Sequence, residues 1–219
     1  MQENLAPRRT YGRESVEFAR TLTFTDGLFA IAMTLLVVDL AVPTLSDGSS
    51  VHELADALSD DTATFVSFAI SFAVIGRYWL AHHTYFSALA RIDRALIALN
   101  LVYLGFIAFL PFPTALLGAY FENPLTIAIY AVNVALVSGM EVVLFSHAQH
   151  HDLLERKLPR DVFRYGVLMS LSPVLFFLLS IPVAFVSTTL AACMWFLGLP
   201  FGIIAERWKP KEADELLLG

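Results

Sequence analysis

The chain has 219 residues, of which 57% are hydrophobic and 16% are charged, and its mean hydropathy is +0.66. Soluble domains carry about half apolar and about a quarter charged residues, so this composition favours a membrane protein over a soluble domain. The formal net charge of −6 and the lack of a basic stripe argue against a nucleic-acid partner.

The apolar residues gather into six stretches, and each is close to the roughly 20 helical residues that cross a hydrocarbon core. In chain order we expect membrane-spanning helices over about Thr21–Val42, Thr62–Leu80, Ala95–Gly118, Leu125–Phe145, Phe163–Leu179 and Pro182–Ala205. A continuation of the second to Leu89 stays open, and a Ser-Ile-Pro break separates the last two. Between the first two, Ser46–Asp61 predicts a short amphipathic surface helix. The chain is thus expected to be a single all-α integral membrane domain over residues 1–219.

The basic residues give an independent indication of topology. All 14 lysines and arginines fall before the first stretch, between the second and third, between the fourth and fifth, or after the sixth, with Arg77, Arg91 and Arg94 assigned to the second group. Six spans place all four groups on one side of the membrane. The positive-inside rule then predicts that the N-terminal segment 1–20 and the C-terminal tail 206–219 lie in the cytoplasm.

The first stretch carries unusual polar residues at its start. Asp26 lies inside the predicted span, where a charged group is expensive, and Arg20 is six positions away, which is poor spacing for pairing on one helix. Trp79, His82 and Asn100 are expected at a matching depth. We therefore expect a polar network that packs the first helix against the second and third, although direct contact of Asp26 or Arg20 with an ion stays open.

The first stretch also has an apolar face. At 100° per residue, Ile31, Leu35 and Val38 share one side of the helix with Thr34, roughly opposite Asp26. Periodicity by itself is compatible with an ordinary lipid-facing or packing surface.

Other polar residues give weaker signals. His147, His150 and His151 have spacing that a metal site can use, but no thiolate supports them, and we expect no bound metal. Glu141 inside the fourth stretch fits a packed or protonated group between helices better than a proton relay. We find no paired carboxylates, catalytic triad, phosphate loop or redox motif, so neither an enzyme nor a cofactor is expected.

Several separated motifs resemble the transmembrane protein 175 family of potassium channels in its bacterial single-repeat form. Arg20-x-x-x-Phe24-Thr25-Asp26 is similar to that family's R-x-x-x-F-S-D signature, with Thr25 in place of serine. The likeness continues through the residues after Asp26, Tyr78-Trp-Leu-Ala-His-His83, Asn100-Leu101 and Pro111-Phe-Pro-Thr114, and covers about Ser15 to Gly118.

The resemblance implies a homotetramer of six-helix subunits in which the first helix of each lines a central pore. In that family a bulky apolar side chain five residues after the motif aspartate forms the narrowest ring, and Ile31 occupies that position. Leu35 and Val38 would extend the constriction, and Thr34 would add a polar group to the pore. Arg20, Phe24, Thr25, Asp26, Trp79, His82 and Asn100 would form the supporting network.

We therefore expect a moderately selective potassium-permeable cation channel, closed by an apolar ring rather than by a carbonyl filter, in a bacterial inner membrane. Its expected partners are copies of itself, membrane lipid and the permeant K⁺. Two alternatives stay open. One is a proton- or ion-coupled secondary transporter with Asp26, His82 and Glu141 as a relay, and the other is a non-conducting membrane scaffold.

Overall fold

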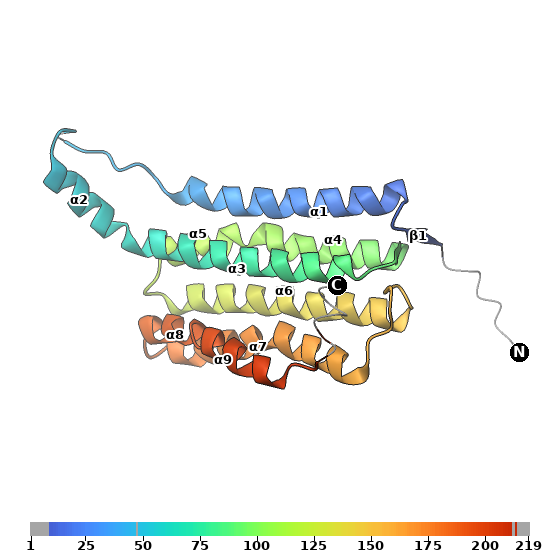
Figure 1. Cartoon of the computed structure of the whole chain (residues 1–219). Helices are drawn as coiled ribbons and strands as arrows, with labels where there is room; N and C mark the ends of the chain where they lie inside the picture. Colours follow the sequence, from blue (N-terminus) through green and yellow to red (C-terminus); the bar gives the residue numbers. More distant parts are fainter. Residues whose placement is uncertain (1–8, 47, 212, 214–219) are drawn as a thin grey trace, which may run out of the picture.

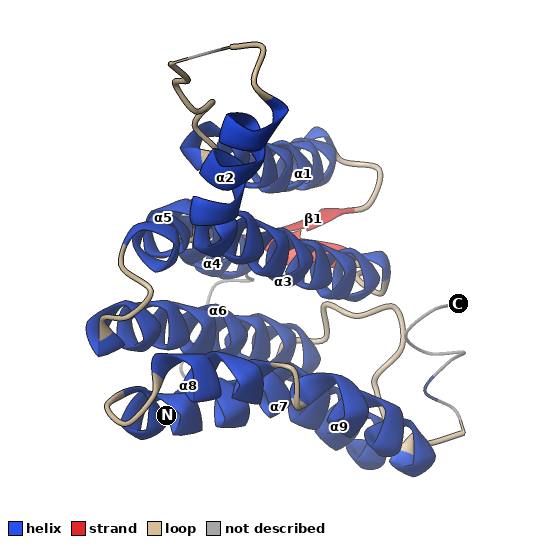
Figure 2. Cartoon of the chain, turned by 90° about the vertical axis from the view of Figure 1, so that its left-hand side faces the viewer, coloured by secondary structure: helices blue, strands red, loops and turns tan. Residues whose placement is uncertain are grey.

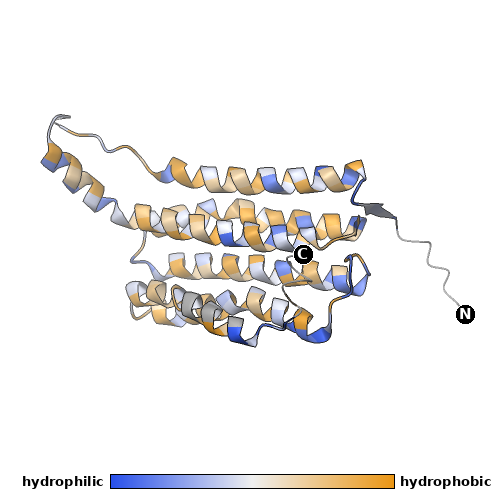
Figure 3. Cartoon of the chain, in the orientation of Figure 1, coloured by the Kyte–Doolittle hydropathy of each residue, from blue (hydrophilic) through white to orange (hydrophobic). Residues whose placement is uncertain are grey.

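The structure is a computed structural model that describes residues 9–46, 48–211 and 213. Within this part of the chain, five helical segments are long and apolar enough to cross a membrane: Val16–Asp39, Thr62–Ser87, Arg94–Ala119, Pro124–His150 and Arg160–Ala184. Apolar residues cover most of their length, and hydrophilic residues concentrate towards the helix ends (Figure 3). The chain is therefore built as an integral membrane protein.

The helices stack in successive layers (Figures 1 and 2). Helix α1 (Val16–Leu35) lies on one side of the bundle, and α3 (Thr62–Ser87), α4 (Arg94–Phe109) and α5 (Pro111–Ala119) form the layer beneath it. Helix α6 (Pro124–His150) follows, and α7 (Arg160–Ala184), α8 (Thr188–Trp195) and α9 (Gly198–Ala205) cover its far side. This order leaves α1 covered on one side only.

Helix α1 begins earlier than the apolar pattern predicts. The Ser15 hydroxyl accepts a hydrogen bond from the Phe18 N–H at 3.2 Å and so caps a helix that begins at Val16 rather than at Thr21. At its other end the helix tightens into the 3-10 turn η1 (Leu36–Asp39), which ends before the predicted Val42. The surface helix α2 (Val51–Asp60) lies inside the segment predicted for it, and none of its residues is buried.

The third predicted stretch contains two helices. Helix α4 ends at Phe109, and α5 begins at Pro111, whose missing N–H suits the first position of a helix. Helix α6 begins at Pro124, where the Asn123 side chain accepts a hydrogen bond of 3.0 Å from the Leu125 N–H, and it continues to His150, beyond the expected end at Phe145.

The predicted boundary between the fifth and sixth stretches is wrong. Helix α7 runs through both Pro173 and Pro182 and ends at Ala184. A proline removes one backbone hydrogen bond, but neighbouring helices can compensate inside a membrane bundle. The chain instead leaves the helix around Phe185, and Ser187 caps the next helix with a bond of 3.2 Å to the Leu190 N–H.

The predicted sixth helix is consequently divided into α8 and α9, which run back along α7 in Figure 1. A 3-10 turn, η2 (Glu206–Trp208), follows. Of the two segments predicted to be cytoplasmic, residues 1–8 and residues 212 and 214–219 lie outside the described part of the chain.

A small antiparallel sheet was not expected. Strand β1 (Thr10–Gly12) pairs with β2 (Arg91–Asp93), which ties the segment before α1 to the connection between α3 and α4. Arg13 adds an ion pair with Glu155 at the same end of the bundle. These contacts fix where α1 starts relative to the rest of the protein.

Arg77 was assigned wrongly to the connection between the second and third spans. Because α3 continues to Ser87, Arg77 lies ten residues inside the helix. Hydrogen bonds join this part of α3 to α6: the Tyr78 hydroxyl donates to the Val134 carbonyl at 3.0 Å, and the Tyr85 hydroxyl donates to the Leu144 carbonyl at 2.8 Å. Helix α3 is thereby held between α1 and α6.

Candidate functional site

Helix α1 has one buried face and one exposed face. Phe29 and Ala32 of α1 and Leu36, the first residue of η1, are each 1% exposed and pack into the core. On the other side, Ile31 is 59% exposed and Leu35 is 46% exposed. Since both faces are largely apolar, water is an unsuitable environment for the exposed one. In a membrane it can meet lipid or another protein surface.

The exposed apolar residues continue in line beyond the end of the α-helix. Leu35 is the last residue of α1, and Val38, which is 73% exposed, lies in the 3-10 turn. Three residues make one full turn of a 3-10 helix, so Val38 stays on the side of Leu35. We call Ile31, Leu35 and Val38 the apolar stripe. From the rise of the two helix types it is about 12 Å long.

Thr34 lies beside the apolar stripe and is also exposed. Its hydroxyl donates a hydrogen bond of 2.9 Å to the Ile31 carbonyl. Because the proton is used in this way, the lone pairs of the hydroxyl oxygen remain available to a cation or to water.

The buried face of α1 carries a polar network that reaches two other helices. The Asn100 amide of α4 donates to the Thr25 hydroxyl at 2.9 Å, and its carbonyl oxygen lies 3.0 Å from Nε2 of His82 in α3. Thr25 in turn donates to the Thr21 carbonyl at 2.9 Å. With the amide of Asn100 as donor, its oxygen accepts from a proton on Nε2 of His82. One buried asparagine therefore links α1, α3 and α4.

A second contact joins α1 and α3 near the same depth. The indole N–H of Trp79 donates to a carboxylate oxygen of Asp26 at 3.0 Å, and the indole ring stacks on His83 with centroids 5.5 Å apart. This bond gives the carboxylate a donor inside the membrane, where an isolated charge is unfavourable. Of the polar residues expected at one depth, the structure joins Asp26 to Trp79 and His82 to Asn100. Arg20 takes part in neither contact.

Arg20 and Phe24 lie outside this network. Both are exposed on α1, and Arg20 makes no hydrogen bond or ion pair within the described residues. Together with Asn100 they line a groove of about 670 Å³ between α1 and α4. The two ends of the signature thus have different environments: its Thr25-Asp26 end is bonded, and its Arg20 end is open.

Aromatic packing around His82 was missed by the sequence analysis. Its ring stacks on Phe86 with centroids 4.0 Å apart and on Tyr103 with centroids 5.5 Å apart. The spacing of His82 and Phe86, four residues apart on one helix, could have indicated the first contact. Tyr103 comes from α4, and a single sequence does not show which helices are neighbours.

The histidines at the end of α6 do not converge on a metal site. His147 lies 3.0 Å from the Asp93 carboxylate, whereas Nδ1 of His150 and of His151 lie 2.6 Å and 2.8 Å from backbone carbonyls. No group of three metal-binding side chains occurs in the described residues. Burial favours a raised pKa for Asp93, but hydrogen bonds from the Leu96 N–H and His147 outweigh it and hold the pKa of Asp93 below its usual value of 3.8.

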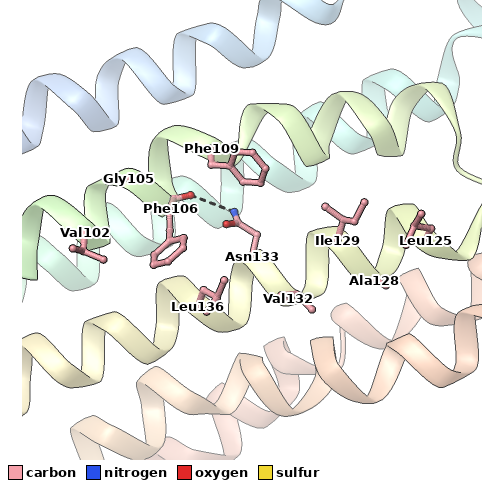
Figure 4. Close-up of a pocket in the computed structure, with 10 residues that line it drawn as sticks. All are labelled: Val102, Gly105, Phe106, Phe109, Leu125, Ala128, Ile129, Val132, Asn133 and Leu136. Carbon is pink, nitrogen blue, oxygen red and sulfur yellow. Dashed lines mark hydrogen bonds between the residues drawn. The ribbon is translucent and has the colours of Figure 1, made fainter.

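A further groove, of about 670 Å³, opens between α4 and α6 (Figure 4). Apart from Asn133, the side chains that line it are apolar, and Gly105 leaves room between the helices. The amide of Asn133 donates one of its two N–H groups to the Phe106 carbonyl at 3.2 Å. The groove is therefore an apolar depression in the bundle surface.

The arrangement of the helices matches a class of solved membrane channels. A crystal structure of a lysosomal potassium-selective channel TMEM175 homolog from Chamaesiphon minutus superimposes with a TM-score of 0.70 and 27% identity. The match covers 87% of this chain and 99% of that one. The fold is therefore that of a TMEM175-type channel.

Sequence comparison defines the family. The family model described as endosomal/lysosomal potassium channel TMEM175 matches residues 20–111. A potassium channel of Chamaesiphon minutus is 34% identical over 154 residues, which are 70% of this chain and 75% of that protein. A potassium channel of Streptomyces collinus is 44% identical over 107 residues, about half of each chain. The chain belongs to the TMEM175 potassium channel family, whose members are channels rather than enzymes.

Proposed function

We propose that four copies of this chain assemble around an axis and conduct potassium through a pore lined by α1. The exposure of the apolar stripe carries this proposal. Ile31, Leu35 and Val38 are exposed in a single chain, while the opposite face of α1 is buried and hydrogen-bonded to α3 and α4. Four such stripes around an axis would cover one another and leave a narrow apolar neck.

A ring of isoleucines would close this neck to ions, because a narrow apolar passage excludes the water that an ion carries. When the ring widens slightly, K⁺ loses part of its weakly held hydration shell more readily than Na⁺ does. Thr34 oxygens beside the ring would replace some of the lost water. This mechanism supports moderate selectivity, and the description of the Chamaesiphon minutus relative as potassium-selective agrees with it.

The proposed topology has six crossings with both termini in the cytoplasm of a bacterial cell, so that the segments 1–20 and 206–219 flank one channel domain. Helices α8 and α9 together would make the sixth crossing, since they run back along α7 (Figure 1). Arg91 and Arg94 still lie together near the end of α3, as the positive-inside rule requires of a cytoplasmic connection. Reporter fusions at the two termini test this arrangement, and opposite locations would refute it.

The test of the pore is Ile31→Asn in the purified full chain, measured in planar bilayers under K⁺ and Na⁺ gradients. A ring of asparagines should let water enter the neck. If this lowers the free-energy barrier to ion passage by about 1.4 kcal/mol, the current should rise about tenfold. Leu175→Asn is the matched control, because Leu175 is 56% exposed but lies on α7, away from α1 (Figure 1). Unchanged current in correctly assembled Ile31→Asn protein would remove Ile31 from the constriction.

The same bilayer assay separates a channel from a coupled transporter or a non-conducting scaffold. Passive flux that stays unsaturated as the ion concentration rises supports a channel. Saturable flux with a fixed proton stoichiometry would indicate a carrier that uses Asp26, His82 and Glu141, although Asp26 and His82 each already have a hydrogen-bond partner. The absence of any current would leave the scaffold reading.

A further inference from the structure

A cavity between α3, α6 and α7 holds two charged side chains that the conduction proposal does not use. Its volume is about 300 Å³, and its lining includes Arg77 of α3, Glu141 of α6 and Ser170 of α7. No residue of α1 lines this cavity, and two of the helices that do, α6 and α7, lie on the far side of the α3, α4 and α5 layer from α1 (Figure 1). It is therefore separate from the proposed pore.

Glu141 places carboxylate oxygens that can accept hydrogen bonds in the wall of this cavity. The residue is 7% exposed, and neither of its carboxylate oxygens accepts a well-formed hydrogen bond from the described residues, although the Ser170 hydroxyl of α7 lies close enough to interact with the carboxylate. It lies nine positions before the end of α6 at His150, which is about 14 Å of helix, so it lies within the apolar part of the membrane. A buried polar group without a partner is unfavourable there, and a ligand with N–H donors would satisfy it.

Arg77 supplies the opposite charge at the exposed side of the cavity. One of its guanidinium nitrogens donates to the Met169 carbonyl at 3.3 Å, which uses one of five N–H donors. Arg77 lies ten residues before the end of α3, about 15 Å along the helix, at nearly the depth of Glu141. A guanidinium at this depth is stabilised by a phosphate, which it can bind through two parallel hydrogen bonds.

We propose that this cavity binds a phosphoethanolamine headgroup, with the phosphate on Arg77 and the primary ammonium donating to Glu141. Both charges of the ligand would then meet an opposite charge in the protein. A choline headgroup has the same phosphate, but its quaternary nitrogen has no N–H to donate. The site should therefore discriminate between two lipids that differ only in the methylation of one nitrogen.

The test measures lipid retained by the purified, delipidated full chain, by native mass spectrometry after mixing with phospholipids of identical acyl chains. Phosphatidylethanolamine should be retained about tenfold over phosphatidylcholine, the ratio expected for a charge-assisted hydrogen bond. The mono- and dimethylated lipids, which keep an N–H, should stay close to phosphatidylethanolamine. Equal retention of the ethanolamine and choline lipids would overturn the proposal without any variant.

Variants assign the two contacts. Glu141→Gln should bring the ethanolamine-to-choline ratio towards one while choline lipid is retained as before, and Arg77→Gln should weaken retention of every phospholipid. Arg94→Gln is the control, because Arg94 is an exposed arginine at the start of α4 and outside the cavity. A ratio unchanged by Glu141→Gln in folded protein would refute the ammonium site. Displacement by soluble glycerophosphoethanolamine would identify the free headgroup as sufficient, and its failure would identify the intact lipid as the ligand.

Discussion

Replacing Asn100 tests whether the buried network holds α1 against the bundle. Asn100 is 1% exposed and makes hydrogen bonds of 2.9 Å to Thr25 and 3.0 Å to His82. Asn100→Leu keeps the number of side-chain heavy atoms and the branching at Cγ, but it removes both bonds and leaves the ring N–H of His82 buried without an acceptor. Two lost bonds and one unpaired donor together should lower the free energy of unfolding by about 2–3 kcal/mol.

The measurement is the free energy of unfolding of the purified chain in detergent, followed by circular dichroism. Asn133→Leu is the matched control, because Asn133 is also a buried helical asparagine but makes one bond, of 3.2 Å, to a backbone carbonyl. Its loss should cost less than about 1 kcal/mol. If Asn100→Leu destabilises the protein no more than Asn133→Leu does, the network does not stabilise the attachment of α1.

Two further predictions concern helix packing and pH. A Cβ on Gly118 would lie 3.1 Å from the Thr64 backbone, so Gly118→Leu should separate α5 from α3 and lower the free energy of unfolding by about 1–3 kcal/mol. Gly139→Leu is the control, because a Cβ on Gly139 meets no atom within 4 Å. Equal melting temperatures for the two leucine variants would refute this prediction. The pKa of Asp93 is lowered in the folded state, so the ionised carboxylate contributes fully to stability above its usual pKa of 3.8, and this contribution is lost as pH falls through the folded-state pKa. The free energy of unfolding, measured between about pH 7 and pH 3, should therefore show the advantage of the wild type over Asp93→Asn narrowing at the acid end. A difference in the free energy of unfolding that does not change with pH would contradict the lowered pKa of Asp93.

Much of α1 could be predicted from the sequence because its two signals are local. The apolar stripe follows from helical periodicity, and it survives the change to a 3-10 turn because Leu35 and Val38 are one such turn apart. Asp26 and Trp79 could be grouped by their expected depth in the membrane, which sequence position gives approximately. The contact at 3.0 Å needed the packing of α1 on α3, which position does not give.

Other features depend on contacts between distant segments. The continuation of α7 through Pro182 reflects compensation by surrounding helices, and a local reading of proline predicts a break instead. The pairing of β1 with β2 joins residues about eighty positions apart without a hydrophobic pattern to reveal it. Arg77 was placed outside the membrane because an arginine is expected there, whereas in the structure it lies inside α3, lines a cavity with Glu141 and donates to the Met169 carbonyl of α7.

The helices that carry the proposed pore and the helices that support them come from different parts of the chain. The family match ends at residue 111, and it contains the apolar stripe, Thr34 and every member of the network with Asn100. Helices α6 to α9 lie beyond it and cover the layer of α3, α4 and α5 on the side away from α1 (Figure 1). Because α6 packs on α4 and α5 and is hydrogen-bonded to α3 and α4, a substitution in α6 or α7 should act on the proposed pore mainly through the layer formed by these three helices. In the cavity proposed to bind lipid, Arg77 of α3 faces Glu141 of α6, so a ligand there would contact both the helices that support the proposed pore and the outer helices.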